Sequence, residues 1–249
     1  MGKKRFDWTT VAGLPQARQD MAAVELIAVQ KVYATSAGEF AALKGADLTV
    51  AQGEFVAVVG KSGSGKSTLI NMITGIDRPT NGEVWVAGMP VHTLTENQIA
   101  VWRGRVLGVV FQFFQLLPTL TALENVMLPM DFCHVYDKAE RPRRAYELLG
   151  MVGVGQQADK LPAADSSNGW LLPALWPTIL HSWWPMSRPA IWTAGRRQRL
   201  LLCLMSWPGR GKTIIMVTHD QDLARQSSRI VTVAEGGIAA DGRPGERDR

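Results

Sequence analysis

One glycine-rich run contains the residue types and spacing that could carry out chemistry. It reads Gly60-Lys61-Ser62-Gly63-Ser64-Gly65-Lys66-Ser67 and is followed by Thr68. The glycines let backbone N–H groups turn toward phosphate oxygens, and a helix that begins here adds its positive N-terminal end. Lys66 would then reach the β- and γ-phosphates, and the Ser67 hydroxyl would ligate Mg²⁺. The alternative is a glycine-rich surface turn.

The residues on either side of this run favour phosphate binding over a surface turn. Phe55–Val59 is apolar and is typical of a buried strand, whereas Thr68–Ile73 is typical of a helix. A strand, a glycine-rich loop and a helix in this order form the setting in which the motif binds nucleotides. The sequence therefore predicts a nucleotide site at residues 60–68.

Other elements are expected from local patterns. Short β-rich runs alternate with turns between Val24 and Val59, which predicts antiparallel strands leading to the loop. We expect a turn at Thr80–Glu83, and further strands at Val84–Val86, Val106–Phe111 and Thr213–Thr218, the last of a buried parallel type. We expect helices from Thr95 to Arg103 and from Thr121 to Met130, each with a capping box, and from Lys138 to Leu149.

Length and composition narrow the class of protein. A chain of 249 residues can bury one large core, or a core and a subdomain. Residues 1–20 show no clear periodicity and are expected to form a loose N-terminal extension, with Met21 an equally good start; residues 243–249 are expected to be a disordered tail. Cys133 and Cys203 fit a reducing compartment, and the sequence has no apolar run of about 18 residues.

Three further motifs resemble the nucleotide-binding subunit of ATP-binding-cassette (ABC) transporters. Val110-Phe111-Gln112 resembles the Q-loop of that family, Val217-Thr218-His219-Asp220 resembles its switch-histidine loop, and Tyr33 lies where the family has an aromatic residue that stacks on adenine. The run from Leu116 to Val126 is similar to the lipoprotein-releasing and macrolide-export branch. The resemblance covers about 24–161 and 211–238.

The resemblance implies a fold and a set of partners. The fold class would be α/β, a P-loop NTPase core with an antiparallel β subdomain and a helical subdomain at about 112–209, within an ATP-binding domain at 21–242. The cofactors would be ATP and Mg²⁺. The partners would be a transmembrane permease and a second ATP-binding subunit, identical or different, at the inner face of the cell membrane, where the protein would be cytoplasmic and peripheral. ATP binding and hydrolysis would then drive export or lipoprotein extraction.

Each residue assigned by resemblance also has a structural interpretation. Tyr33 stacks on adenine in one reading and is a half-buried strand aromatic in the other. Gln112 contacts Mg²⁺ and the attacking water, or is a polar residue at a strand end. His219 senses the γ-phosphate, or is a structural histidine. The aromatic residues Phe111, Phe113 and Phe114 face the membrane partner or belong to the core. The remaining histidines receive the structural interpretation; they are His92, His134 and His181.

Two motifs that the family uses for hydrolysis are absent. Phosphoryl transfer to water needs a second Mg²⁺ carboxylate and a group that activates the water. The family supplies these at a strand that ends in Asp-Glu, preceded by an L-S-G-G-Q signature. No glutamate lies between Glu147 and Glu235, and the apolar run Leu200–Met205 is followed by Ser206 and Trp207.

The region at 163–209 has an anomalous composition. It contains six tryptophans and almost no acidic residues; the tryptophans are Trp170, Trp176, Trp183, Trp184, Trp192 and Trp207. Residues 184–193 can be encoded by nucleotides that, read two bases later, give A-D-E-P-T-G-N-L-D, and the same offset at 162–177 permits the signature. We therefore hypothesise two compensating frameshifts, one near Pro162 and one before Gly211. If the segment is expressed, we expect it not to form the normal signature helix and central strand.

The anomalous region also bears on the charge and on the function. Its four arginines and single aspartate contribute +3 of the net charge of +5, so the remainder is near neutral and no nucleic-acid partner is expected. A GTPase is disfavoured because no N-K-x-D motif is present. The main interpretation is an ATPase subunit of an ABC transporter, and the alternative is a degenerate module that binds ATP without turnover.

Overall fold

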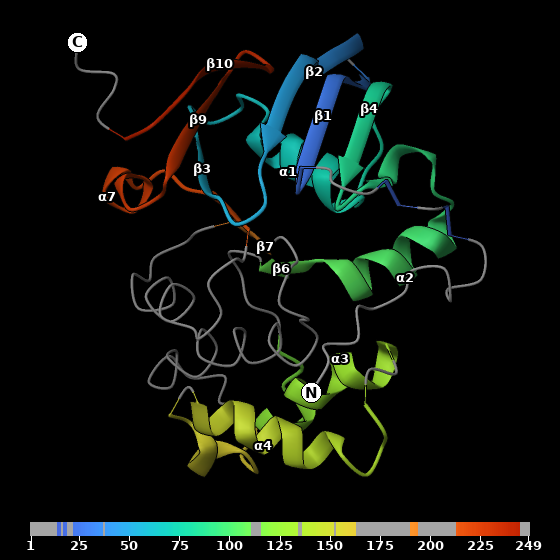
Figure 1. The fold of residues 1–249 in the computed structure, drawn as a ribbon, viewed down its shortest axis with the longest axis vertical. Coiled ribbons are helices and arrows are strands. Elements are labelled where there is room, and N and C mark those ends of the chain that lie inside the picture. The colour runs from blue at the N-terminus through green and yellow to red at the C-terminus, as the bar shows by residue number, and fades with distance from the viewer. Residues whose placement is uncertain are drawn as a thin grey trace.

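The computed structural model describes residues 14–15, 17–18, 22–36, 38–110, 116–133, 136–151, 153–162, 190–193 and 213–244. Predictions for the intervening positions, among them Gln112, His134, His181 and all but the first two residues of the expected tail at 243–249, lie outside the described residues. Figure 1 shows two sheets and α1 (Lys66–Thr74) at one end of the molecule, and helices α3 (Ala122–Cys133) and α4 (Arg141–Met151) at the other. The fold is α/β, as the sequence predicts.

An antiparallel sheet forms the first part. Its strands are β1 (Val24–Thr35), β2 (Gly38–Val50), β4 (Asn81–Val86) and β5 (Met89–Pro90), in the order β2-β1-β4-β5. This confirms the antiparallel strands expected upstream of the loop. The turn expected at residues 80–83 is wrong for its last three residues, because Asn81 and Glu83 pair with β1 and belong to β4.

A mainly parallel sheet forms the second part. Its strands are β3 (Phe55–Val59), β6 (Gly108–Val110), β7 (Ala190–Thr193), β8 (Ile214–Val217), β9 (Arg229–Ala234) and β10 (Gly237–Gly242), in the order β10-β9-β3-β8-β7-β6. Only β10 pairs antiparallel, with β9. Every residue of β8 is buried, as expected for a strand inside a parallel sheet.

Strand β7 corrects one expectation from the sequence. The anomalous segment was not expected to provide the central strand, yet Ala190–Thr193 lies between β6 and β8 and pairs parallel with both. The pairing is continuous, with Ala190 opposite Ile214 and Thr193 opposite Val217. The backbone pairing of these four residues joins β6 and β8 in one continuous sheet. The other apolar run, Leu200–Met205, lies outside the described residues.

The described residues form five α-helices, and the two with a predicted capping box begin where it predicts. They are α1 (Lys66–Thr74), α2 (Glu96–Val106), α3 (Ala122–Cys133), α4 (Arg141–Met151) and α7 (Gln221–Arg225), with short 3₁₀ turns η2 (Val91–Thr93) and η3 (Gly155–Gln157). The Thr95 hydroxyl and the Gln98 side chain form the predicted capping box of α2. Thr121 and Glu124 form the same arrangement at α3. The α2 helix continues three residues beyond Arg103, so β6 begins later than predicted.

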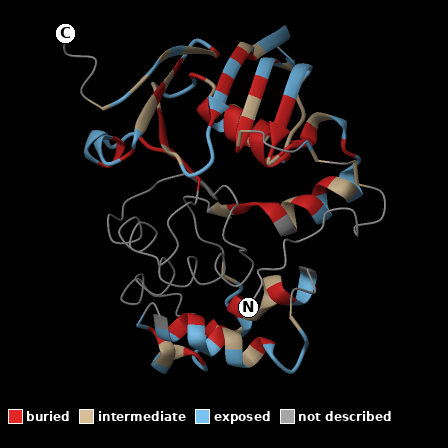
Figure 2. Ribbon diagram, in the orientation of Figure 1, coloured by how far each residue is buried: buried red, intermediate tan, exposed pale blue. Residues whose placement is uncertain are grey.

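Two separate apolar clusters hold the described residues together. The larger cluster joins both sheets, α1 and α2, with Leu69 and Trp102 fully buried. The helical cluster is smaller and lies between α3 and α4; its buried members are Ala122, Val126, Met130, Ala145, Leu148, Leu149, Val154 and Ala158. Figure 2 shows buried and exposed positions alternating along α4, as in an amphipathic helix.

Part of the expected N-terminal extension is packed rather than loose. Leu14 and Ala17 contact the larger cluster. The Arg18 N–H donates to Gly88 O at 2.9 Å, and its guanidinium lies 3.6 Å from the centre of the Trp85 ring. These contacts tie residues 14–18 to the antiparallel sheet, although nothing in their sequence indicated it.

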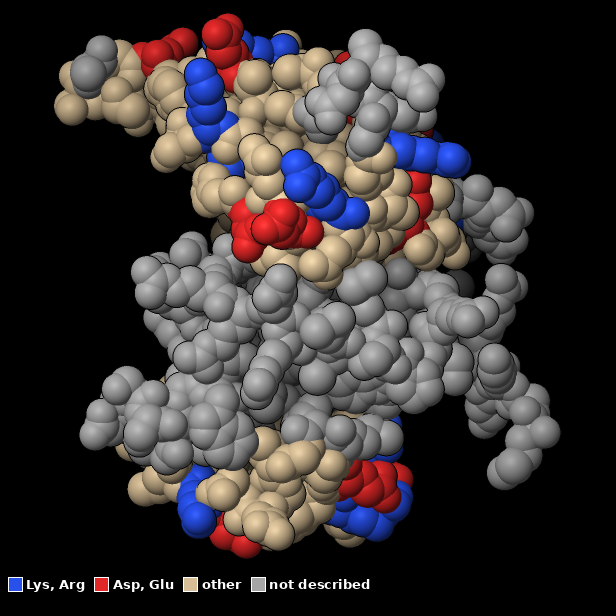
Figure 3. All heavy atoms as spheres, turned by 90° about the vertical axis from the view of Figure 1, so that its left-hand side faces the viewer, with Lys and Arg blue, Asp and Glu red and all other residues tan. Residues whose placement is uncertain are grey.

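The exposed charges are of both signs. On the face shown in Figure 3, acidic and basic side chains are interspersed over the part that the structure describes. Charged side chains also form ion pairs; Arg229, for example, pairs with both Glu54 and Asp241. Among the described helices, none combines the length and the apolar character that a membrane span needs.

Candidate nucleotide-binding site

The glycine-rich loop joins the end of β3 to the first turn of α1. Gly65 caps α1 in the left-handed conformation, with φ of 106°, and provides no side-chain cap. A Cβ at this position would lie 2.6 Å from Ala42 O, so the close approach of β2 also requires glycine. The first N–H groups of α1 therefore have no capping side chain at Gly65 and can face a phosphate.

Lys66 is held over the loop by neutral oxygen atoms. Its Nζ donates to Gly60 O at 3.0 Å and Lys61 O at 2.5 Å, and lies 3.4 Å from Ser64 Oγ. The residue is only 6% exposed, and this burial lowers the pKa of the Lys66 ammonium. Because none of these three oxygens carries a charge, the ammonium remains an attractive group for an anion.

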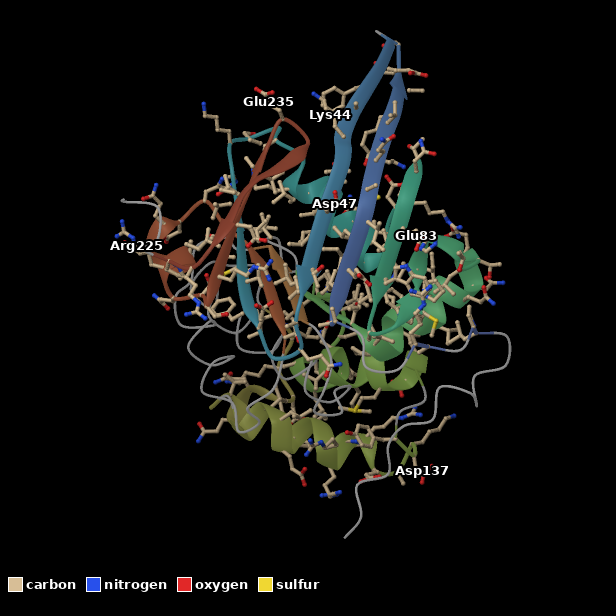
Figure 4. All side chains as sticks on the ribbon, turned by 45° about the horizontal axis from the view of Figure 1, so that its top comes forward. Lys44, Asp47, Glu83, Asp137, Arg225 and Glu235 are labelled. Carbon is tan, nitrogen blue, oxygen red and sulfur yellow. The ribbon has the colours of Figure 1, made fainter. Side chains whose placement is uncertain are left out.

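The turn between β9 and β10 supports the loop. The Gly236 N–H donates to Ser64 O at 3.1 Å, and the Lys44 N–H of β2 donates to Gly236 O at 2.8 Å. A Cβ on Gly60 would lie 2.2 Å from Val233 O. Figure 4 shows Glu235, in this turn, close to Lys44. The sequence did not indicate this support, because the turn lies more than 160 residues from the loop.

Strand register brings His219 to the same edge of the sheet as the loop. Val58 of β3 and Val217 of β8 are paired in parallel, and Gly60 and His219 each lie two residues further along. His219 is exposed, and Thr218 before it is buried and accepts a hydrogen bond from the Asp220 N–H. The carboxyl ends of β6 and β7 lie at this edge as well, because all four strands are parallel.

The remaining predicted site residues have different environments. Ser67 is exposed on the first turn of α1, with Thr68 partly buried beside it, whereas Lys61, Ser62 and Gly63 are exposed in the loop. Gln112 lies outside the described residues, two positions after the end of β6. His92 contacts the backbone of Val84 and the Trp85 ring, which agrees with its structural interpretation.

Tyr33 lies half-buried on β1, and its hydroxyl donates to Asp77 Oδ2 at 2.9 Å. Burial and the nearby Asp77 carboxylate raise the pKa of the Tyr33 phenol, against a smaller opposite effect of the Thr68 hydroxyl. Burial alone would raise the pKa of Asp77, but hydrogen bonds from Lys31, the Arg78 N–H and Tyr33 hold it below its ordinary value. No motif in the sequence pointed to Asp77 or Lys31.

The described residues fit a nucleoside triphosphate. Glycines that cannot carry a Cβ, the free first turn of α1 and the Lys66 ammonium together form a cradle for phosphate oxygens. The exposed Ser67 hydroxyl could serve as a ligand for Mg²⁺. Within the described part of the chain, no group of three or more His, Cys, Asp or Glu side chains is placed to hold a metal ion. The ion would therefore depend on phosphate oxygens and isolated protein ligands.

A parallel sheet with a glycine-rich loop leading into a helix, and a histidine at the same edge, defines a P-loop nucleotide-binding protein. Comparison with known sequences identifies the family. The profile of the ABC transporter family matches residues 43–170. The chain belongs to the ABC transporter family, as one of its ATP-binding subunits.

Relatives and solved structures agree with this assignment. An uncharacterised ABC transporter ATP-binding protein of Methanocaldococcus jannaschii is 36% identical over 86% of this chain and 97% of its own length. The lipoprotein-releasing system ATP-binding protein LolD of Anaeromyxobacter dehalogenans is 39% identical over 88% and 93%. The macrolide export ATP-binding/permease protein MacB of Rhodopirellula baltica is 34% identical over 88% of this chain but only 33% of its own length. The dimeric ATP-binding cassette MJ0796 with ADP and phosphate superposes with a TM-score of 0.75, at 32% identity, over 88% of this chain and 98% of its own.

Proposed function

We propose that the chain binds ATP and Mg²⁺ at residues 60–68 and couples nucleotide turnover to a transmembrane permease. Lys66 and the first turn of α1 bind the phosphates, Ser67 and Gln112 ligate Mg²⁺, Tyr33 stacks on adenine, and His219 contacts the γ-phosphate. The observation that carries the proposal is the Lys66 ammonium, buried in a glycine cradle with only neutral oxygens as its hydrogen-bond partners.

The relatives support the partners that we propose. One related protein belongs to a lipoprotein-releasing system, and another joins an ATP-binding part and a permease in a single chain. The solved cassette that superposes on this chain is dimeric. We infer that this chain pairs with a second ATP-binding subunit, of the same or a different sequence, at the cytoplasmic side of a membrane transporter that exports a lipophilic substrate or extracts lipoproteins.

The alternative is that this chain binds ATP but does not turn it over. Hydrolysis in the family depends on carboxylates that follow the central strand, and here Thr193 at the end of β7 is followed by Ala194, Gly195 and Arg196. The family profile also ends its match at residue 170, inside the anomalous region. Without a carboxylate beside the attacking water, ATP would bind but phosphoryl transfer would be slow.

Binding and hydrolysis measured on the same preparation separate the two functions. We expect a fluorescent ATP analogue to bind to the unaltered chain, the Lys66→Ala variant to lose this binding, and the Lys138→Ala variant, which removes an exposed lysine, to retain it. Hydrolysis that Lys66→Ala abolishes supports the ATPase. Binding without hydrolysis supports the alternative, and absence of binding would contradict both.

The frameshift hypothesis has its own test. The nucleotide sequence must permit residues 184–193 to be read two bases later as A-D-E-P-T-G-N-L-D, and otherwise the hypothesis is wrong. If it can be read so, we expect a chain with residues 163–209 replaced by the shifted reading to hydrolyse ATP faster than the present chain. Equal rates would show that this segment does not limit turnover.

A further inference from the structure

A cluster of three polar side chains surrounds one end of β1. Lys31 and Tyr33 are two residues apart on this strand, so both side chains lie on the same face of the sheet. Asp77 follows α1 and reaches both of them: its Oδ1 lies 2.6 Å from Lys31 Nζ, and its Oδ2 accepts from the Tyr33 hydroxyl at 2.9 Å. Neither Asp77 nor Lys31 belongs to any motif in the sequence.

The Asp77 carboxylate is itself fixed in place. Its Oδ1 also accepts from the Arg78 N–H at 2.7 Å, and Lys31 Nζ donates to Arg78 O at 2.8 Å. The Lys31 and Asp77 side chains are 14% and 30% exposed, so water competes only weakly for these bonds. A carboxylate with these donors cannot turn away without breaking several hydrogen bonds. Tyr33 therefore has a rigid acceptor that holds its ring in one orientation.

Lys31 also distinguishes the two faces of the Tyr33 ring. Its Nζ lies 4.9 Å from the ring centroid, over one face, while it remains bound to Asp77. An ammonium at this distance is attracted to the π-electrons of the ring. Because the cation covers this face, a flat base can stack only on the opposite face.

The cluster is connected to the phosphate loop through α1. The Asp77 and Ile76 N–H groups donate to Asn71 O at 3.2 Å and 3.0 Å, at the C-terminal end of the helix. The other end of α1 begins at Lys66, in the loop itself. One rigid helix therefore sets the position of the Tyr33 anchor relative to the phosphate cradle.

We propose that Asp77, held by Lys31, is a positioning residue that orients the Tyr33 ring before nucleotide binds, so that a purine base stacks on the face away from Lys31. The proposal rests on the proposed nucleotide site. Orienting the ring in advance removes an entropy cost that binding would otherwise bear. Asp77 and Lys31 then contribute to recognition of the base and not to recognition of the phosphates.

The test compares ATP with inorganic tripolyphosphate, which has the phosphates but no base. We expect Asp77→Ala to weaken ATP binding about 3- to 10-fold, since part of the stacking energy is lost, and to leave tripolyphosphate binding unchanged. Tyr33→Phe keeps the ring but removes the anchored hydroxyl, so it should give a similar loss. Combining the two should add little, because both remove the same contact. Lys31→Met should weaken ATP binding in the same selective way.

Asp47→Ala is the matched control. Asp47 accepts from the Ala28 N–H of β1 at 2.7 Å, and no hydrogen bond in the described part of the chain joins it to Tyr33, so its loss should not affect ATP binding selectively. Equal losses for ATP and tripolyphosphate in Asp77→Ala and Tyr33→Phe would overturn the proposal in favour of a general structural role. No loss in Tyr33→Phe would overturn it as well, and this mild change protects the test against a failure to fold. If the unaltered chain binds neither ligand, the proposed nucleotide site itself fails.

Discussion

Gly65 is restricted both by its backbone and by its neighbours. Its φ of 106° lies in the left-handed region, and Ala42 O of β2 approaches to within 2.6 Å of the position that a Cβ would take. An L-residue would therefore be strained and would also push β2 away. The same residue allows the first turn of α1 to begin without a capping side chain. The geometry of the loop and the stability of the protein thus both depend on the absence of a Cβ at position 65.

Replacing Gly65 tests this restriction. Gly65→Ala should lower the free energy of unfolding by about 2–4 kcal/mol, the sum of left-handed strain and overpacking. Gly150→Ala is the control, because Gly150 has no neighbour within 4 Å of a Cβ and lies in α4, where alanine is preferred by up to about 1 kcal/mol. Urea denaturation of the two variants gives both values. Equal stability of the two variants would contradict the close approach of β2.

Among the elements, α3 is joined to the segment before it by one side chain. Asn125 is 5% exposed; its Nδ2 donates to Leu120 O and Thr121 O at 2.9 Å and to Leu117 O at 3.1 Å. Its Oδ1 accepts from the Leu117 N–H at 2.9 Å. A single amide thus satisfies four backbone groups of residues 117–121 and fixes the path of the chain into the helix.

Asn125→Asp should destabilise the protein although it changes few atoms. The variant retains the acceptor for the Leu117 N–H but places a carboxylate oxygen against three carbonyl oxygens, which should cost about 2–4 kcal/mol. Asn97→Asp is the matched control: Asn97 is exposed in the first turn of α2, where a negative charge is tolerated or slightly favourable. Thermal unfolding of both variants provides the comparison. A loss in Asn97→Asp as large as that in Asn125→Asp would refute the role of the buried amide.

Helices and strands could be predicted from local sequence signals, whereas strand pairing and the supports of the site depend on contacts between residues distant in the sequence. Capping boxes at Thr95 and Thr121 and the apolar run at β3 are encoded within a few residues, so they could be predicted. The choice of Ala190–Thr193 for β7 depends on pairing with strands far along the chain, which periodicity does not report. For the same reason the loop residues were found by their motif, whereas the supports at Gly236 and Asp77 were not.

At the scale of the whole molecule, the described residues have two apolar clusters of unequal size. The larger one spans both sheets and α1, and the helical cluster has only eight buried members, five of which are alanine or valine. Backbone hydrogen bonds also join the start of α3 to the segment after α4: the Ala122 N–H donates to Lys160 O, and the Leu123 N–H donates to Ala158 O. Less buried apolar area gives a smaller free energy against local opening.

Native-state hydrogen exchange should therefore separate the two clusters. We expect the amides of α3 and α4 to exchange through an opening of lower free energy than the amides of β3 and β8. Leu148→Ala, in the helical cluster, should lower the opening free energy of α3 and α4 by about 2–4 kcal/mol and leave β3 and β8 almost unchanged. Leu69→Ala is the counterpart in the larger cluster and should lower protection in β3 and β8. A common opening free energy for all four elements, shifted equally by either variant, would show instead that the two clusters unfold as a single cooperative unit.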